Sequence, residues 1–216
     1  MIRIHAFLLF LFSLTVGPAS VLHGRTLVLE ASSTADRMAA IAEDAPRMSW
    51  AAYMPWPGIY YGSAMDLQQG RGLLIRFPLE SIPQGQRITH AELIFTIHLT
   101  SGPEPRLYIW RLLADWGVGV CHQYRMIRPQ PVEWIVPGAR GSSLDRAIRP
   151  TAVPRIQGPG ERVVNVTEDV EIWYTGAAPN QGWIITVEDP GVLVRTACPL
   201  YDTATQWKLR VTYEPE

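Results

Sequence analysis

The chain has 216 residues, 47% of them hydrophobic and 18% charged, with a formal net charge of −1. This length predicts one domain, or two at most. The composition excludes a disordered chain and a multi-span membrane protein, and the near-neutral charge argues against nucleic-acid binding. Because 17 glycines and 18 prolines accompany eight Trp and eight Tyr, we expect many short strands and turns.

The first residues have the pattern of a secretion signal. Arg3 precedes an apolar run from Ala6 to Val16, and the small residues Gly17-Pro18-Ala19-Ser20 follow. The run is shorter than the roughly 20 apolar residues that span a bilayer. We therefore expect a signal peptide over residues 1–24 and one domain over residues 25–216, secreted or in the cell envelope, with no membrane span in the mature chain. The alternative is an N-terminal core strand or short anchor.

In the first half of the domain, the residue pattern predicts two strands, one on each side of an aromatic segment. Arg25 to Ala31 and Arg71 to Leu79 have strand patterns, whereas Ala35 to Ala45 fits a short helix or a strand. Met48 to Tyr61 is rich in aromatic residues, and its two prolines forbid a central strand there. A turn is expected over residues 80–85.

The clearest strand runs from Ile88 to Thr100. Ala91, Leu93, Phe95, Ile97 and Leu99 recur with a period of two, which predicts that they share one face. We expect the turn at residues 101–103 to return the chain as a hairpin, with residues 106–113 as the partner strand.

The second half begins with a long stretch of little periodicity, Asp115 to Pro154, which predicts a long loop with one short strand at most. Glu161 to Val166 predicts a strand, and Thr167 is expected to cap a helix that ends at Gly176. Residues 182–188 and 206–213 predict the closing strands. The sum is an all-β protein, an antiparallel β-sandwich or jelly roll with one or two short helices and a long loop.

The two cysteines, Cys121 and Cys198, leave two alternatives open. In an oxidising compartment the pair can form a disulfide that closes a long loop. Otherwise both are small buried apolar thiols.

No motif predicts catalysis or a cofactor. His90 and His98 would stand about 26 Å apart on one strand, too far to share a metal ion. Cys121 and His122 are adjacent, so their side chains are expected to diverge, and no phosphate-binding loop or hydrolase motif occurs. We expect no enzyme activity and no cofactor. Oxygen ligands for a structural Ca²⁺ could come from Asp66, Asp145, Asp189 and Asp202, without a diagnostic spacing.

Five segments in order resemble the DNRLRE-type domain, a secreted β-jelly-roll family related to the alginate-binding carbohydrate-binding modules of family 96. The most specific is RGLLIRFPLESIPQGQRITHAELIF. The sequence departs from that pattern in lacking the literal DNRLRE string and in having Cys198-Pro199 where the family has a Ser-Glu pair. The resemblance implies a jelly roll that binds polysaccharide. The five segments are Tyr60–Leu67, Arg71–Phe95, Trp116–Asp145, Val164–Thr186 and Arg195–Tyr213.

Sugar binding requires aromatic rings that stack on sugar faces, and acidic sugars also require guanidinium groups. We expect other tryptophans, such as Trp110 and Trp207, to pack in the core. The alternative is that several of the aromatic candidates plug the ends of the sandwich. The candidate ligand residues are Trp50, Tyr53, Trp56, Tyr60 and Tyr61, with Arg125, Arg128 and Arg140 from the long loop.

The sequence therefore predicts a secreted, non-catalytic module that binds extracellular polysaccharide or a cell-surface glycan through end loops, with acidic and neutral polymers both left open. The second hypothesis is a structural or adhesive cell-surface module acting by protein–protein contact. The third is a polysaccharide hydrolase or lyase that uses the long loop.

Overall fold

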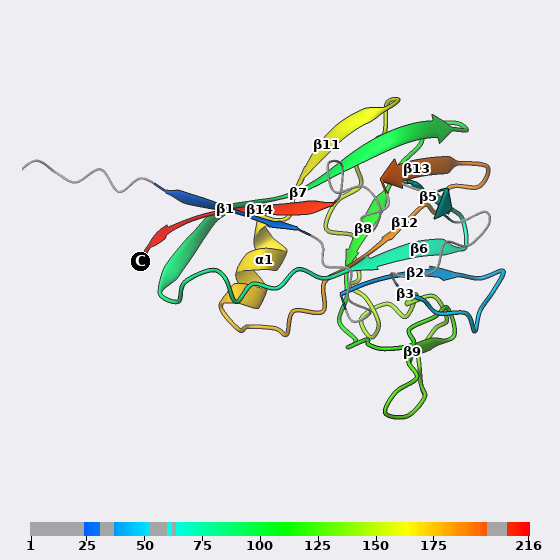
Figure 1. Ribbon diagram of the computed structural model, residues 1–216, viewed down its shortest axis with the longest axis horizontal. Helices are drawn as coiled ribbons and strands as arrows, with labels where there is room; N and C mark the ends of the chain where they lie inside the picture. Colours follow the sequence, from blue (N-terminus) through cyan, green and yellow to red (C-terminus); the bar gives the residue numbers. More distant parts are fainter. Residues whose placement is uncertain (1–23, 31–36, 52–59, 62–63, 198–206) are drawn as a thin grey trace, which may run out of the picture.

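The computed structural model describes residues 24–30, 37–51, 60–61, 64–197 and 207–216, with only the backbone described at residues 50–51 and 60–61. Two antiparallel sheets face each other within this part of the chain (Figure 1). The antiparallel β-sandwich expected from the sequence is confirmed. No helix among the described residues is long and apolar enough to cross a membrane.

The larger sheet has seven strands, organised around the long strand β7 (Gln86–Ser101). One edge of β7 pairs first with β14 and then with β13, and the other edge pairs with β11. The other strands of this sheet are β1 (Arg25–Glu30), β4 (Tyr60–Tyr61), β5 (Ala64–Gln68), β11 (Gly160–Asn165), β13 (Leu193–Ala197) and β14 (Lys208–Pro215).

The smaller sheet has five strands in the order β3-β2-β6-β12-β8. Its inward side chains, among them Leu73, Ile75 and Trp183, meet those of the seven-stranded sheet in the main core, where Phe95 and Trp207 stack at 4.2 Å. The strands are β2 (Met38–Ala42), β3 (Trp50–Ala51), β6 (Arg71–Ile75), β8 (Tyr108–Arg111) and β12 (Trp183–Thr186).

The prediction that β7 forms a hairpin with the strand that follows it is wrong. The strand that follows, β8, pairs with β12 in the five-stranded sheet, so the turn at residues 101–103 carries the chain from one sheet to the other. Both edges of β7 are already paired by β11, β13 and β14, which leaves no place for β8.

Leu99 also departs from the expected alternation. The register of β7 against β13 shifts between Thr196 and Arg195, which face Ile97 and Leu99. The bulge inserts His98 and changes the direction of the side chains beyond it. Leu99 is therefore 42% exposed, although Ile97 is buried.

The single described helix, α1 (Thr167–Tyr174), covers the part of β7 that the five-stranded sheet does not reach (Figure 1). Val166, Val170 and Trp173 share its buried face. Thr167 is not the cap: Val166 occupies that position, and the Thr167 hydroxyl accepts a hydrogen bond from the Ala91 N–H instead, at 2.9 Å. Gly176, with φ +76°, follows the helix end as expected.

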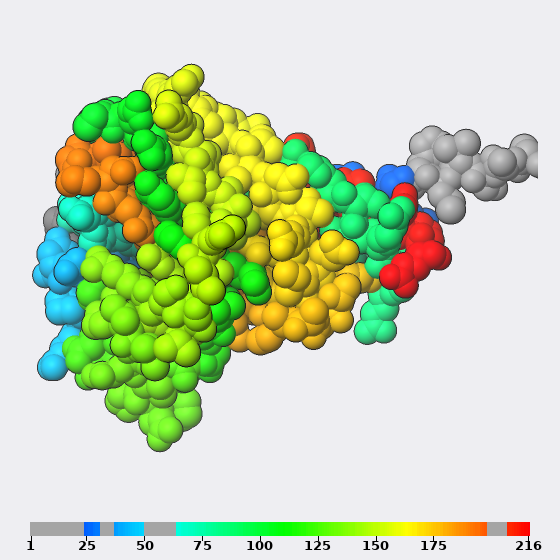
Figure 2. Space-filling view, turned by 180° about the vertical axis from the view of Figure 1, so that it is seen from behind, coloured from blue at the N-terminus to red at the C-terminus, as the bar shows by residue number. Residues whose placement is uncertain are grey.

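A third layer covers the outer face of the five-stranded sheet. We call it the loop lobe, residues 115–147; it contains the short strands β9 (Tyr124–Met126) and β10 (Val132–Glu133) where one strand at most was expected. Trp116 and Trp134 of the lobe pack on Ile41, Leu74 and other outward residues in a second hydrophobic cluster. Seen from behind, the lobe projects from the molecule as a distinct mass, yellow-green in Figure 2.

Candidate functional site

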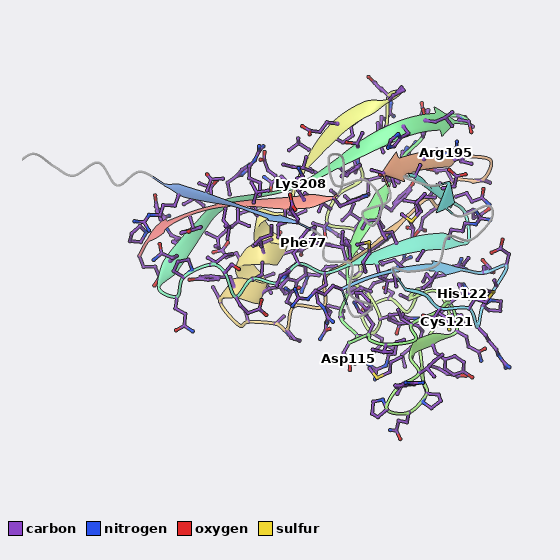
Figure 3. All side chains as sticks on the ribbon, viewed as in Figure 1. Phe77, Asp115, Cys121, His122, Arg195 and Lys208 are labelled. Atoms are coloured by element: carbon purple, nitrogen blue, oxygen red, sulfur yellow. The ribbon has the colours of Figure 1, made fainter. Side chains whose placement is uncertain are left out.

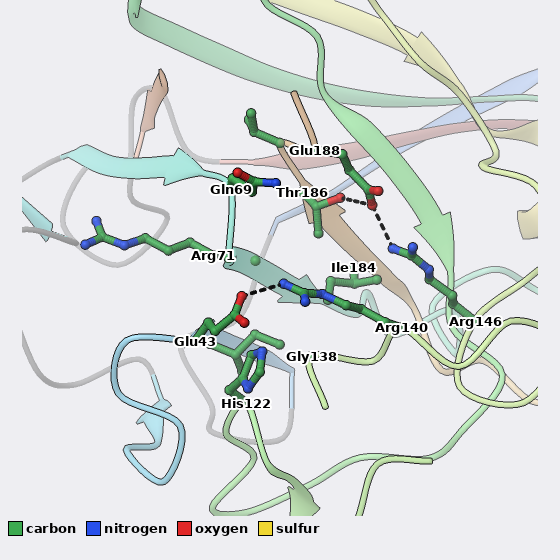
Figure 4. Close-up of a pocket in the computed structure, with 14 residues that line it drawn as sticks. Glu43, Gln69, Arg71, His122, Gly138, Arg140, Arg146, Ile184, Thr186 and Glu188 are labelled. Atoms are coloured by element: carbon green, nitrogen blue, oxygen red, sulfur yellow. Dashed lines mark hydrogen bonds and ion pairs between the residues drawn. The ribbon is translucent and has the colours of Figure 1, made fainter. Parts of the chain in front are cut away.

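A cavity of about 570 Å³ lies between the outer face of the five-stranded sheet and the loop lobe (Figure 4). We call it the arginine cavity. Charged and titratable groups from four parts of the chain meet in it: the segment after β2, β6, the loop lobe and the segment after β12. They are Glu43, Arg71, His122, Arg140, Arg146 and Glu188.

The hollow floor of the arginine cavity follows from the pairing of strands. Ile41, Gly72 and Thr186 are direct cross-strand neighbours on β2, β6 and β12, so Gly72 stands in the middle of the row without a side chain. A Cβ atom at Gly72 would lie 3.1 Å from Ile184 Cδ1, so even an alanine would crowd this floor. Because Gly72 has no side chain, the floor of the cavity is deepest at the middle of this row of residues.

Two arginines of the loop lobe are held in the cavity walls by acidic partners from the sheet. Arg140 Nη2 donates to Glu43 at 2.9 Å, and Arg146 Nη1 donates to Glu188 at 2.9 Å. The Arg146 guanidinium also lies over the Trp110 ring, 3.8 Å from its centroid. A guanidinium has five N–H donors, and each of these ion pairs uses one nitrogen, so the groups are positioned while retaining donors for a ligand.

The acidic partner of Arg140 is kept ionised. The hydrogen bond from Arg140, together with its charge, lowers the pKa of Glu43 below its usual value, and burial opposes this shift only in part. A glycosidase needs one carboxyl group whose pKa is raised so that it can donate a proton. The pKa of Glu43 is lowered instead, so this carboxylate is suited to hold Arg140 in place and not to donate a proton.

His122 is the sixth charged or titratable group of the cavity, and its environment is different. Its side chain is only 6% exposed, and its Nε2 atom has no hydrogen-bond partner among the described residues. Burial is the main cause that lowers the pKa of His122, the charge of Arg140 adds to this, and the charge of Glu43 opposes it. In the sequence, only the position of His122 in a long loop marks this residue, and no local pattern indicates a binding role.

The three arginines predicted as ligand residues do not converge. Arg140 lines the cavity, whereas Arg125 forms an ion pair with Asp115 and also donates to its carbonyl oxygen at 2.9 Å. Arg128 is exposed between β9 and β10. Arg146, which the sequence did not single out, takes the second place in the cavity.

The predicted aromatic platform lies mostly outside the described structure. The backbone places Trp50 in β3 and Tyr60 and Tyr61 in β4, on edge strands of opposite sheets. This agrees with the exclusion of a central strand by the prolines. Tyr53 and Trp56 lie outside the described residues.

The adjacent Cys121 and His122 do not act on each other. Cys121 is fully buried as a free thiol, and its sulfur accepts a hydrogen bond from the Tyr124 N–H at 3.3 Å. Both residues lie below the five-stranded sheet in Figure 3, on the side opposite to Lys208 and Arg195. Cys198 lies outside the described residues.

The aspartates considered for Ca²⁺ have other partners. Asp145 is fully buried, and its carboxylate accepts hydrogen bonds from the backbone N–H groups of Ile135, Val136 and Gly141 at 2.9 to 3.0 Å. Asp66 forms a two-pronged ion pair with Arg195. Asp189 accepts only long contacts from Tyr108, and Asp202 lies outside the described residues. The described residues include no group of three metal-ligating side chains.

A second, larger groove of about 1010 Å³ lies beside the start of α1. Asp169 in its wall accepts hydrogen bonds from Thr151 and Trp183 and pairs with Arg111 at 2.9 Å. Burial raises the pKa of Asp169, although these three partners oppose the shift. Because the carboxylate already has three donors, it joins the helix to the core, and it is not directed at a ligand.

Comparisons with known proteins add no family to this geometry. No family model matches the chain, and no curated protein is significantly similar to it.

Proposed function

We propose that this protein is a secreted module that binds an acidic polysaccharide, with one acidic sugar unit held in the arginine cavity. The observation that carries the proposal is the pair of positioned guanidinium groups, Arg140 and Arg146, in the walls of one cavity. Planar guanidinium groups match carboxylates through two parallel hydrogen bonds. The N-terminal signal pattern supports secretion.

The dimensions and character of the cavity support binding. Its volume of about 570 Å³ falls in the range of small-ligand sites, roughly 300 to 1,000 Å³. The Trp110 ring, which stacks with Tyr108 at 6.4 Å, lies under the Arg146 guanidinium, so an aromatic ring stands next to one of the two arginines. The loop lobe, which supplies both arginines, is rigidly anchored by Asp145. Loops held on a rigid sheet are common carriers of binding residues.

The experiment compares two arginines of the same lobe. Alginate and polygalacturonate are presented in affinity gels and as oligosaccharides in calorimetry. We expect Arg140→Gln to weaken binding by about tenfold, because one charge-assisted hydrogen bond is worth roughly 1.5 kcal/mol or more. Arg128→Gln is the matched control, since Arg128 is exposed outside the cavity, and it should bind like the wild type.

Four outcomes would reject or redirect the proposal. Absence of binding to any acidic polymer rejects it, and equal losses in both arginine variants reject the cavity as the site. Loss of binding in Trp56→Ala alone would move the site to the aromatic segment. Shortening of the polymer that disappears in His122→Ala would instead favour the hydrolase or lyase hypothesis.

A protein-contact function remains the second candidate because of one observation. Three large apolar side chains of the lobe and the segment after it are more than half exposed: Ile135 at 65%, Leu144 at 59% and Ile148 at 71%. Exposed apolar groups of this kind mark contact surfaces when they form one patch. Sedimentation that shows a defined oligomer, lost in Leu144→Ser, would favour this function.

A further inference from the structure

His122 is a buried residue of the arginine cavity with a polar side-chain atom that lacks a hydrogen-bond partner among the described residues. The residue is only 6% exposed, yet its Nε2 atom has no hydrogen-bond partner in the described part of the chain. Buried polar atoms in native proteins are nearly always paired, so this unpaired atom needs an explanation, and a group that enters the cavity is one that its position offers. In Figure 4 the imidazole stands at the base of the cavity, below Glu43 and Arg140.

The backbone of Gly138 lies directly against this nitrogen and covers it. The Gly138 N–H donates to the His122 carbonyl oxygen at 2.7 Å, which holds the two residues together. A Cβ atom at Gly138 would lie 2.9 Å from His122 Nε2, closer than real contacts allow. Gly138 also has φ +80°, a conformation that favours glycine. A side chain is thus excluded from the space next to Nε2, which only the Gly138 backbone covers. Contact between a ligand and Nε2 therefore requires a small movement of the Gly138 turn or of the imidazole ring.

The charged groups that face His122 come from every element around the cavity. Arg140 of the lobe and Glu43 after β2 are its nearest charged neighbours, and these two are paired with each other. Arg71 of β6, Arg146 of the lobe and Glu188 after β12 line the rest of the cavity. Among the described residues, the carboxylate that acts on His122 is that of Glu43, and Arg140 already neutralises it.

We propose that His122 donates its Nε2–H to the carboxylate of the bound sugar, and that the protein takes up a proton at His122 as this ligand binds. The inference rests on the proposed function, because it requires an acidic ligand in the arginine cavity. The proton is assigned to Nε2: this nitrogen carries no hydrogen in the neutral imidazole of the free protein, gains H⁺ from solvent, and becomes the donor of an imidazolium paired with the ligand carboxylate.

The direction of the pH dependence follows from the surroundings. Burial and Arg140 lower the pKa of His122 from 6.5 in the free protein, so the ring is neutral at pH 7. A ligand carboxylate at hydrogen-bond distance stabilises the charged ring and raises that pKa. By linkage, protonation must then strengthen binding to the same extent. Affinity rises as the pH falls through the interval between the two pKa values, by at most about tenfold per pH unit for one proton.

The experiment is calorimetric titration of the full domain with an alginate-derived tetrasaccharide between pH 5.5 and pH 8. Each pH is measured in two buffers of different ionisation enthalpy, which gives the number of protons taken up. We expect uptake between zero and one proton, and an affinity at least about fivefold higher at pH 5.5 than at pH 8. The sugar carboxylates stay ionised over this range, since such groups titrate near pH 3 to 4.

Two variants isolate the residue. His122→Asn should bind without proton uptake and with a flat pH profile. The control is His90→Asn: His90 lies on β7, on the seven-stranded sheet, where its Nε2 pairs with Glu92 at 3.1 Å. This variant should keep the wild-type pH profile. A neutral oligosaccharide of the same length should show no proton uptake with any of the proteins.

The outcomes separate the inference from the function on which it rests. Binding that takes up no proton overturns the inference and leaves the proposed function intact, whereas no binding at any pH overturns both. Should His122→Asn not fold, the wild type alone decides the matter by NMR. The pKa of His122, followed through its ring protons, must rise when the cavity is saturated with the tetrasaccharide, and an unchanged pKa overturns the inference.

Discussion

The five-stranded sheet buries both of its faces, but it does so against two different kinds of partner. Its inner face, with Leu73, Ile75 and Trp183, meets a second regular sheet. Its outer face, with Ile41, Leu74 and Ile184, meets the irregular loop lobe through Trp116 and Trp134. Two regular sheets interdigitate over their whole area, whereas an irregular loop covers a sheet only where its own side chains reach. The arginine cavity occurs on the side of the sheet that the loop covers incompletely.

The two faces are also stabilised by different interactions. The inner face depends on area burial and on ring contacts, such as the 4.6 Å edge-to-face pair of Trp173 and Trp183. The loop lobe depends on side chains that hydrogen-bond to backbone groups: Asp145 accepts three N–H bonds, and Trp134 Nε1 donates to the Cys121 carbonyl oxygen at 2.9 Å. The difference predicts that damage to the inner face unfolds the protein, while damage to the lobe stays local.

The largest effect is expected for Trp183→Ala on the inner face. Trp183 is fully buried, and it also donates to the buried Asp169 at 2.7 Å. Loss of a buried tryptophan costs roughly 3 to 5 kcal/mol of unfolding free energy, and the loss of one of the three donors to Asp169 adds to this cost. Urea denaturation followed by circular dichroism measures the change. Trp183→Phe, which keeps a ring and loses only the N–H, should cost less. A loss below about 1 kcal/mol in the alanine variant would contradict the central place of this residue.

A smaller, local effect is expected for Asp145→Ala in the loop lobe. The substitution leaves three backbone N–H groups without their acceptor, at a cost of about 3 kcal/mol in total if each loses roughly 1 kcal/mol. Hydrogen exchange should increase over residues 115–147 and remain slow in β7. Asp145→Asn keeps one acceptor oxygen and should show an intermediate effect. Equal acceleration in both sheets would show that the lobe is not a separate unit of stability.

The smallest effect concerns the free protein and pH. The pKa of His122 is lower in the folded state, so the unfolded state binds the proton more readily. The contribution of His122 to the free energy of unfolding is therefore complete above pH 6.5, where the ring is neutral in both states. As the pH falls below 6.5 towards the lowered pKa, that contribution is lost, at no more than about 1.4 kcal/mol per pH unit. Asp169 has the opposite sign: its raised pKa favours the folded state below 3.8, and that gain is lost as the pH rises through its folded value.

Thermal unfolding at pH 7.5 and pH 5.5 tests this prediction. The wild type should lose more stability between the two values than His122→Asn, and the contribution of Asp169 cancels because both proteins share it. Equal losses in the two proteins would mean that His122 is not desolvated in the folded state.

The sequence predicted the regular parts of the sandwich well. The alternation in β7 and β14 and the apolar positions of α1 identified these elements because one face of each is buried and the other is solvated. The same rule failed for β2, where helix and strand remained open. All five of its residues are buried, so no alternation was available to read.

The pairing of strands was less predictable than the strands themselves. The turn after β7 has the residues of a hairpin turn, but β8 joins the other sheet because the edges of β7 are taken by strands distant in sequence. Of the candidate ligand residues, Arg140 lines the cavity, while Arg125 and Arg128 do not. Nothing local distinguishes these three arginines in a stretch without periodicity.

The sequence by itself determined that this chain forms sheets, where the main strands lie and that a long loop interrupts them, because alternation and turn residues act over a few neighbouring positions. Only the tertiary structure decided that the loop folds over the outer face of the five-stranded sheet and brings Glu43, His122, Arg140 and Glu188 to one cavity. That convergence depends on contacts between segments far apart in the chain, and the energy of such contacts is not encoded in any single segment.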